Sequence, residues 1–246
     1  MTHTNAIPSR RKFLKATVGM ATGITGLSML PAMAFSHPFL PPYPLADELN
    51  PLAGEASPLI GEVSPSADDM NIIGPKEGYS PQIGTLVSMM NWMRIVMLSS
   101  VKGMTTEQLD FLLDGKANTI GAMLFHLAAT DAFYHEHTFN GLDWGKWDKS
   151  IQDKFGVAME LGDPARKQIK GNNLDFYTGL LQETRDKTLA EFRKRDDKWL
   201  MTVDTKWPWG PTNNYCKWFH VCEHESNHNG QIKFLKSRLA GAKGGE

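Results

Sequence analysis

Four long segments between residues 80 and 240 repeat apolar side chains at helical spacing, and no segment alternates as a β-strand does. The four segments span residues 81–103, 118–139, 173–198 and 213–240. The apolar residues of the first recur every three or four positions, as Ile83, Leu86, Met90, Met93 and Met97. The four segments lie within a stretch of about 160 residues, which is enough to bury a core of its own. The pattern predicts an all-α four-helix bundle.

Local signals place the ends of these helices and the connections between them. Ser80 precedes Pro81, a pair typical of a helix start, and Asn173 is the predicted cap of the third long helix. A short helix is expected near 106–113. Residues 140–172 combine Gly, Pro and charged residues, with a helical stretch near 148–159. They predict a long crossover between helices 2 and 3.

The N-terminus carries an export signature. Residues 9–15 read Ser-Arg-Arg-Lys-Phe-Leu-Lys, the twin-arginine pattern, and the apolar stretch 16–30 follows. Ala32-Met33-Ala34 supplies small residues for cleavage, so residues 1–34 are predicted to be a signal peptide. The apolar stretch is too short to span a bilayer comfortably. We therefore expect recognition by the twin-arginine export machinery and a location in the periplasm or cell envelope.

Residues 35–80 contain eight of the fourteen prolines and predict an extended arm or linker. The alternative is an arm that packs across its own domain or a neighbouring subunit, which leaves a homodimer open. The bundle itself is expected over residues 81–240, followed by a tail, 241–246. The leader holds four of the 26 basic residues and none of the 27 acidic ones, so the remaining chain has a net charge of about −5. Nucleic acid is not an expected partner, because the phosphate backbone requires a basic surface.

Two cysteines, Cys216 and Cys222, lie six positions apart in the fourth segment. On a helix their Cα atoms would be separated by about 9 Å, beyond the reach of a disulfide. Their spacing also differs from the CxxC form of zinc and redox motifs. Both are interpreted as packing residues.

Histidines in the second and fourth segments indicate a metal site. His224 and His228 lie one helical turn apart, on the apolar face that also carries Val221 and Ile232. Two imidazoles at this spacing can bind one metal ion. His126 lies beside the apolar stripe of the second helix and is the best third ligand. The alternative interpretation, core histidines bonded to other side chains, requires a partner for each buried ring.

The remaining histidines are predicted to lie outside this site. His135 is about 180° around its helix from His126 and is expected to face solvent. His137 lies about 16 Å further along, where it can line a pocket mouth. His220 is assigned to the core or to a position behind the ligands, because it is about 12 Å from His228.

Several residues near these histidines in the sequence also have predicted roles in or around the site. Gln231 is expected to support His228 from one turn away, and Gly230 to allow close approach of a neighbouring helix. Glu223, Glu225 and Thr130 are candidates for proton transfer, but surface or capping roles are favoured for each.

The sequence His220-x3-His224-x3-His228-Asn229-Gly230-Gln231-Ile232 resembles the fourth-helix signature of the DinB-like superfamily. The segment Asn118-Thr119-Ile120-Gly121-x4-His126 is similar to the second-helix half of that signature, and the resemblance covers about residues 80–240. It implies a four-helix bundle with an unusual connection order. It also implies a divalent metal bound by His126, His224 and His228, and thiol-dependent transferase or isomerase activity. The chain departs from many relatives at Asn227 and Asn229, where they carry histidine and arginine.

The sequence therefore predicts a metal-dependent transferase or hydrolase that activates a thiol or water for a small-molecule substrate. Zinc is the first expectation, with nickel, iron or manganese as alternatives; three histidines leave a tetrahedral zinc ion one open position. The alternative function is a non-catalytic metal-binding or sequestering protein of the cell envelope, and a third is a structural domain that has lost activity. Met89, Met93 and Met97 could suit Cu(I) but are typical core residues. Four tryptophans lie in the connections between helices, where they could cover a substrate pocket or anchor loops: Trp144, Trp147, Trp207 and Trp209.

Overall fold

The computed structural model describes residues 70–241, all of them within the unit Pro44–Glu246. The predicted signal peptide, most of the predicted arm and residues 242–246 lie outside the described residues. The last part of the arm, residues 70–80, consists of turns and bends and contains no helix or strand.

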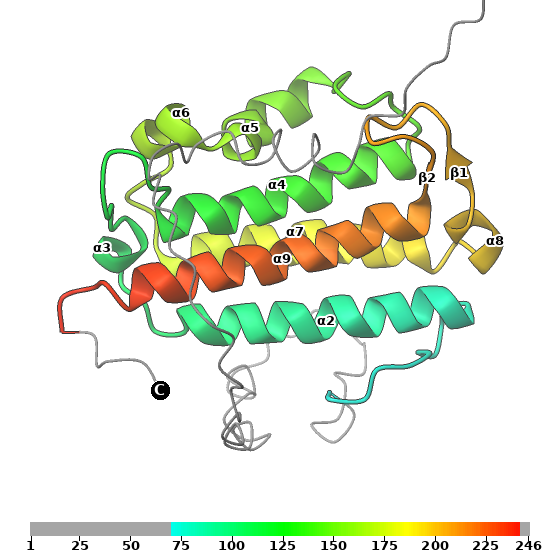
Figure 1. The fold of residues 1–246 in the computed structure, drawn as a ribbon, viewed down its shortest axis with the longest axis horizontal. Helices are drawn as coiled ribbons and strands as arrows, with labels where there is room; N and C mark the ends of the chain where they lie inside the picture. Colours follow the sequence, from blue (N-terminus) through cyan, green and yellow to red (C-terminus); the bar gives the residue numbers. More distant parts are fainter. Residues whose placement is uncertain (1–69, 242–246) are drawn as a thin grey trace, which may run out of the picture. The chain divides into compact units, whose positions relative to one another are not determined.

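Four long helices form the bundle in Figure 1: α2 (Pro81–Val101), α4 (Ile120–Thr138), α7 (Leu174–Phe192) and α9 (Asn214–Lys236). The all-α fold class is confirmed. Short helices α3 (Thr106–Leu109) and α8 (Asp197–Leu200) occupy two of the connections. The third long helix ends at Phe192 rather than at 198, because the chain turns there and starts α8. Within the described residues, no helix combines the length and apolar character needed to cross a bilayer.

The connection order explains the long crossover. Followed by colour in Figure 1, α2 and α9 run in one direction, and α4 and α7 run in the opposite one. Because α4 and α7 are parallel, the chain must return to the starting end of the bundle between them. Helices α5 (Lys149–Glu160) and α6 (Gly162–Gln168) make this return, and α5 packs along α4.

A pair of two-residue strands corrects the expectation that the chain has none. β1 (Val203–Asp204) pairs antiparallel with β2 (Thr212–Asn213), directly before α9. Strands of two residues are too short for apolar alternation to be visible in a sequence. The pair closes the loop that contains Trp207 and Trp209.

The apolar residues predicted to face inward are buried. Met93 and Met97 are 7% and 0% exposed and belong to the core, which supports a packing role over Cu(I) binding. Trp207 is 4% exposed and its ring contacts those of Trp144 and Tyr134, so these connections are anchored by their tryptophans. Cys222 packs against the same cluster, whereas Cys216 is exposed and has no packing role.

The start of α2 is capped from a distant part of the chain. Ser80 occupies the cap position, but its side chain makes no capping hydrogen bond, which corrects the prediction. Instead Asp197 Oδ1 accepts hydrogen bonds from Ser80 Oγ (2.5 Å), Gln82 N (3.0 Å) and Ile83 N (3.2 Å). One carboxylate of α8 therefore satisfies the free N–H groups of α2 and ties the two helices together.

We predict that Asp197→Ala lowers the free energy of unfolding by about 1–2 kcal/mol, as the loss of a helix cap does. Burial alone would raise the pKa of Asp197, but the hydrogen bonds from Ser80, Gln82 and Ile83 lower it below its ordinary value. The stability that the Asp197 carboxylate contributes is therefore fully present above the unfolded-state pKa of about 3.9 and is lost as the pH falls below that value. Urea unfolding at pH 7 and pH 3 measures both effects. Asp186→Ala, which removes only an exposed contact to Gln182, is the control; equal losses in the two variants would contradict the capping role.

Candidate metal centre

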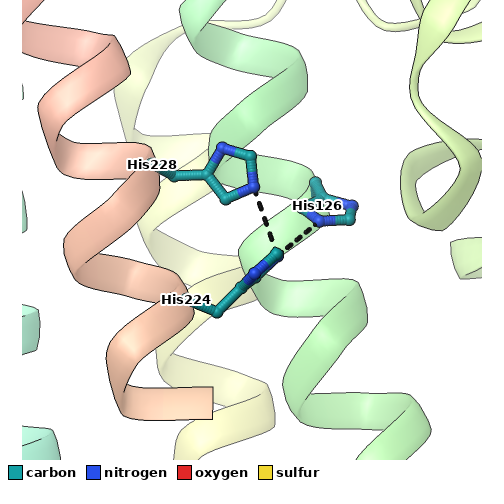
Figure 2. Close-up of side chains that lie close together, drawn as sticks. All are labelled: His126, His224 and His228. Carbon is teal, nitrogen blue, oxygen red and sulfur yellow. Dashed lines mark hydrogen bonds between the residues drawn. The ribbon is translucent and has the colours of Figure 1, made fainter. Parts of the chain in front are cut away.

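Three histidine rings from two helices meet inside the bundle. His126 comes from α4, and His224 and His228 come from α9 (Figure 2). His224 Nε2 lies 2.8 Å from His126 Nε2 and 3.2 Å from His228 Nε2. One nitrogen from each ring lies within 4.8 Å of the others, in an arrangement that can hold a metal ion. The predicted convergence of residues 126, 224 and 228 is thus present in the structure.

The crossover orients the ring of His126. Its Nδ1 lies 3.0 Å from the carbonyl oxygen of Ala158, near the C-terminal end of α5. A carbonyl can only accept, so Nδ1 carries the proton and Nε2 presents its lone pair to the other two rings. This contact also satisfies one of the carbonyl groups that a helix end leaves free. The α5 helix therefore fixes the tautomer of a ring on α4.

Burial keeps the three rings uncharged. His126 and His228 are 7% and 6% exposed, and His224 is half-buried. Burial lowers the pKa of each ring below its ordinary value, and the proximity of the neighbouring rings lowers the pKa of His224 and His228 further. Neutral imidazoles are the form that binds metal, so the cluster needs no deprotonation near neutral pH.

Two of the three nitrogen–nitrogen separations are close to those around a tetrahedral divalent cation. Zinc–nitrogen bonds of about 2.0–2.1 Å at tetrahedral angles separate ligand nitrogens by about 3.3 Å. The two separations from His224 Nε2, 2.8 and 3.2 Å, are close to that value, and all three ligand nitrogens lie within 4.8 Å of one another. Without a cation, neighbouring Nε2 atoms must share protons between them. Nδ1 of His228 is buried and has no hydrogen-bond partner among the described residues. Gln231 donates to Asn227 Oδ1 at 3.0 Å, and its side chain acts to raise the pKa of His228 against the larger lowering by burial.

His220 lies beside the cluster and is half-buried. Its ring centroid is 5.3 Å from that of His224, and its Nδ1 is 2.8 Å from the hydroxyl of Tyr134. Burial raises the pKa of Tyr134, so its hydroxyl stays protonated; a hydroxyl can either donate or accept in this hydrogen bond, according to the tautomer of His220.

Two other histidines have structural contacts. His137 Nδ1 donates to the carbonyl of Leu142, and its Nε2 lies 2.8 Å from Lys217 Nζ and 3.2 Å from Asp204 Oδ2. These contacts hold the connection after α4 and the strand β1. His135 does not simply face solvent: it is half-buried, its ring packs on Phe139, and burial lowers its pKa.

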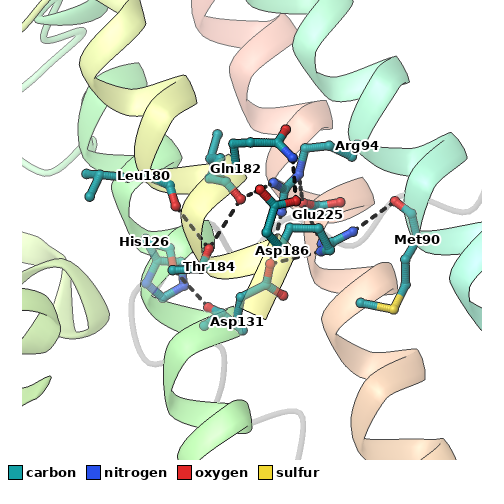
Figure 3. Close-up of polar contacts among 12 residues, drawn as sticks. Met90, Arg94, His126, Asp131, Leu180, Gln182, Thr184, Asp186 and Glu225 are labelled. Atoms are coloured by element: carbon teal, nitrogen blue, oxygen red, sulfur yellow. Dashed lines mark hydrogen bonds and ion pairs between the residues drawn. The ribbon is translucent and has the colours of Figure 1, made fainter. Parts of the chain in front are cut away.

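Glu225 is the clearest correction among the polar residues. The sequence favours a surface or capping role for Glu225, but its side chain is 1% exposed and belongs to a buried network of four charges (Figure 3). The network joins Arg94 of α2, Asp131 of α4 and Arg185 of α7 to Glu225 of α9, so each long helix contributes one charge.

Both arginines bridge both acids in this network. Asp131 Oδ2 lies 3.1 Å from Arg94 and 3.0 Å from Arg185, and Glu225 Oε1 contacts Arg94 and lies 3.3 Å from Arg185. The arginines also donate to backbone carbonyls of the neighbouring helices, Leu181 and Met90. The network therefore ties α4 and α9, which carry the histidines, to each other and to α2 and α7.

The other polar predictions have mixed outcomes. Glu223 is exposed, as favoured. Thr130 is buried and donates to the carbonyl of His126, so its role is in the backbone of the site helix. Gly230 is exposed and a side chain there would meet no atom within 4 Å, so no helix packs against it, contrary to the prediction.

The fold and the cluster together define a DinB-like bundle with a three-histidine centre. The family model for Mycothiol-S-transferase, a DinB-like family, matches residues 85–241. The chain belongs to this family. No curated protein matches it.

Proposed function

We propose that the protein is a metal-dependent thiol S-transferase whose metal is held by His126, His224 and His228. The observation that carries this proposal is the convergence of three neutral imidazole nitrogens within 4.8 Å. The family match supports a thiol as co-substrate, and mycothiol is the thiol its description names. Zinc suits three imidazoles and an open fourth position, so we propose zinc as the resident metal.

The residues of the chain have separate parts in this activity. His126 is fixed by the Ala158 carbonyl, and His224 and His228 are set one turn apart by α9. When bound, the metal supplies a Lewis acid that lowers the pKa of a thiol or of water. In the transfer, sulfur forms a bond to the electrophilic carbon, the leaving group departs with its electron pair, and the thiol proton passes to solvent.

Metal removal and replacement test this function. Purified protein is assayed for conjugation of mycothiol to 1-chloro-2,4-dinitrobenzene before chelation, after chelation, and after addition of zinc, nickel, iron or manganese. We expect conjugation to disappear with the metal and to return with at least one of these ions. Parallel assays with glutathione and cysteine define the thiol. Stoichiometric metal without transfer or hydrolysis would instead indicate a binding or sequestering protein.

We also propose that the protein reaches the periplasm or cell envelope by the twin-arginine route, on the basis of residues 9–15. Replacing Arg10 and Arg11 by lysine should leave the protein in the cytoplasmic fraction. Unchanged distribution of the double variant between cell fractions would contradict this proposal.

A further inference from the structure

A cavity of about 520 Å³ lies at one end of the bundle, outside the histidine cluster. One wall consists of four residues of the loop before α4, and the opposite wall is the α9 face that carries Asn227, Gly230 and Phe234; the loop residues are Leu113, Asp114, Ala117 and Asn118. Cavities of about 300–1,000 Å³ are typical of small-molecule sites.

The cavity adjoins the proposed metal ligands on both helices. Met123 lines it from α4, one turn before His126, and Gln231 lines it from α9, one turn after His228. Gln231 donates to Asn227 Oδ1 at 3.0 Å, so two lining side chains of α9 are held together. A molecule in the cavity therefore touches residues that lie one helical turn from a proposed ligand on each helix.

The walls are mainly apolar and carry few charges. Leu113, Ala117, Met123, Phe234 and Leu235 form the apolar surface. The amides of Asn118, Asn227 and Gln231 add hydrogen-bonding groups, and Asn118 is held in place by accepting from Gly162 N.

Asp114 is the one ionisable residue among the lining residues, and Lys116 N and Ala117 N donate to its carboxylate. No lysine or arginine lines the cavity, although Arg238 stacks on the Phe234 ring, 5.0 Å from its centroid. The cavity is open to solvent on one side, and an anion placed here would face the Asp114 carboxylate and mostly apolar walls without a lining cation to pair with.

We propose that this cavity binds the electrophilic second substrate, and that this substrate is an uncharged, mainly apolar molecule with hydrogen-bonding groups. The inference rests on the proposed S-transferase function, whose other substrate is the thiol. It assigns the cavity to substrate specificity and the histidines to metal binding.

Gly230 offers a way to fill the cavity without disturbing the fold. A Cβ at Gly230 meets nothing within 4 Å, so Gly230→Leu places a side chain in open space on the cavity wall. Gly179→Leu is the matched control, because Gly179 is exposed on α7, also has open space, and does not line the cavity. Both changes replace a helical glycine with a better helix former, so both variants should fold.

Two dyes with the same ring skeleton test the class of ligand on the protein as purified. N-phenyl-1-naphthylamine is uncharged, and 8-anilino-1-naphthalenesulfonate adds a sulfonate. We expect the neutral dye to bind at least about tenfold more tightly, and Gly230→Leu to weaken its binding at least about tenfold while Gly179→Leu leaves it unchanged. Equal binding of the two dyes, or equal binding by the two variants, would overturn the inference.

Substrate kinetics test the assignment to the electrophile. With mycothiol and 1-chloro-2,4-dinitrobenzene, Gly230→Leu should raise KM for the electrophile at least about tenfold, with KM for the thiol and metal content unchanged. A KM increase for the thiol alone would overturn the assignment. Failure of the proposed function is distinguishable, because dye binding needs no turnover. If the two dyes bind with different affinities but no thiol transfer occurs, the S-transferase proposal is wrong. If transfer occurs but the two dyes bind equally, only the assignment of this cavity is wrong.

Discussion

His224→Ala is expected to weaken zinc binding at least about 100-fold, the largest effect of any single histidine substitution. His224 Nε2 lies between the other two rings, 2.8 Å from His126 and 3.2 Å from His228. Loss of a group that merely supports a ligand already costs about 10–100-fold in metal affinity, so loss of a ligand should exceed that range. Competition with a chromophoric zinc chelator measures the affinity directly.

The same experiment includes a histidine outside the cluster. His135 is half-buried on the helix that carries His126, and His135→Ala removes an equal side chain. The His135→Ala variant should bind zinc with the same affinity as the unaltered protein. The stabilisation that zinc gives to the folded state, seen as a rise in Tm, should be lost in His224→Ala alone. Similar losses in the two variants, or full affinity in His224→Ala, would show that these three rings do not hold the metal.

The parts of the site that could be predicted from the sequence depend on local helical geometry. A rotation of about 100° per residue places His224 and His228 on one face, and the apolar residues around them show which face is buried. The same argument selected His126 over His135 on the facing helix. Regular spacing also located α2, α4 and α9 to within a few residues.

The contacts that could not be predicted join residues far apart in the chain. Ala158 orients the His126 ring through its backbone carbonyl. Every residue has this group, so the residue type at position 158 does not indicate the contact. Asp197 caps α2 although it lies 115 residues after Gln82 in the sequence. Ser80, directly before the helix, was the simpler prediction for the capping side chain. Cavities likewise depend on how loops close, which periodicity does not describe.

Glu225 is different, because a signal for its burial was present. Arg94 falls within the stripe of Met90 and Met97, Arg185 within that of Leu181 and Thr188, and Asp131 within that of Leu127 and Tyr134. Charged residues on apolar stripes are seldom buried unless they are paired. Two acids and two bases on the inward faces of four helices balance in charge. Considering the four helices together would have placed Glu225 inside the bundle.

This balance predicts that Glu225→Gln lowers the free energy of unfolding by about 3–5 kcal/mol, as breaking a buried ion pair does. The substitution keeps the shape of the side chain but leaves two buried arginines with Asp131 as their single counter-charge. Glu223→Gln makes the same chemical change on the exposed face of the same helix and should stay within about 0.5 kcal/mol. Chemical denaturation of the metal-free proteins measures both, so that metal binding does not contribute.

A double-variant cycle separates the loss of charge balance from the loss of packing. Arg94→Met removes the arginine that contacts Glu225, and combined with Glu225→Gln it leaves one buried pair, Arg185 with Asp131. Because the charges balance again, the double variant should be more stable than the sum of the two single losses predicts, by about 1–3 kcal/mol. Additive losses would mean that the four charges act independently. Coupled losses would mean that one network spanning α2, α4, α7 and α9 sets the orientation of the two helices that present the histidines.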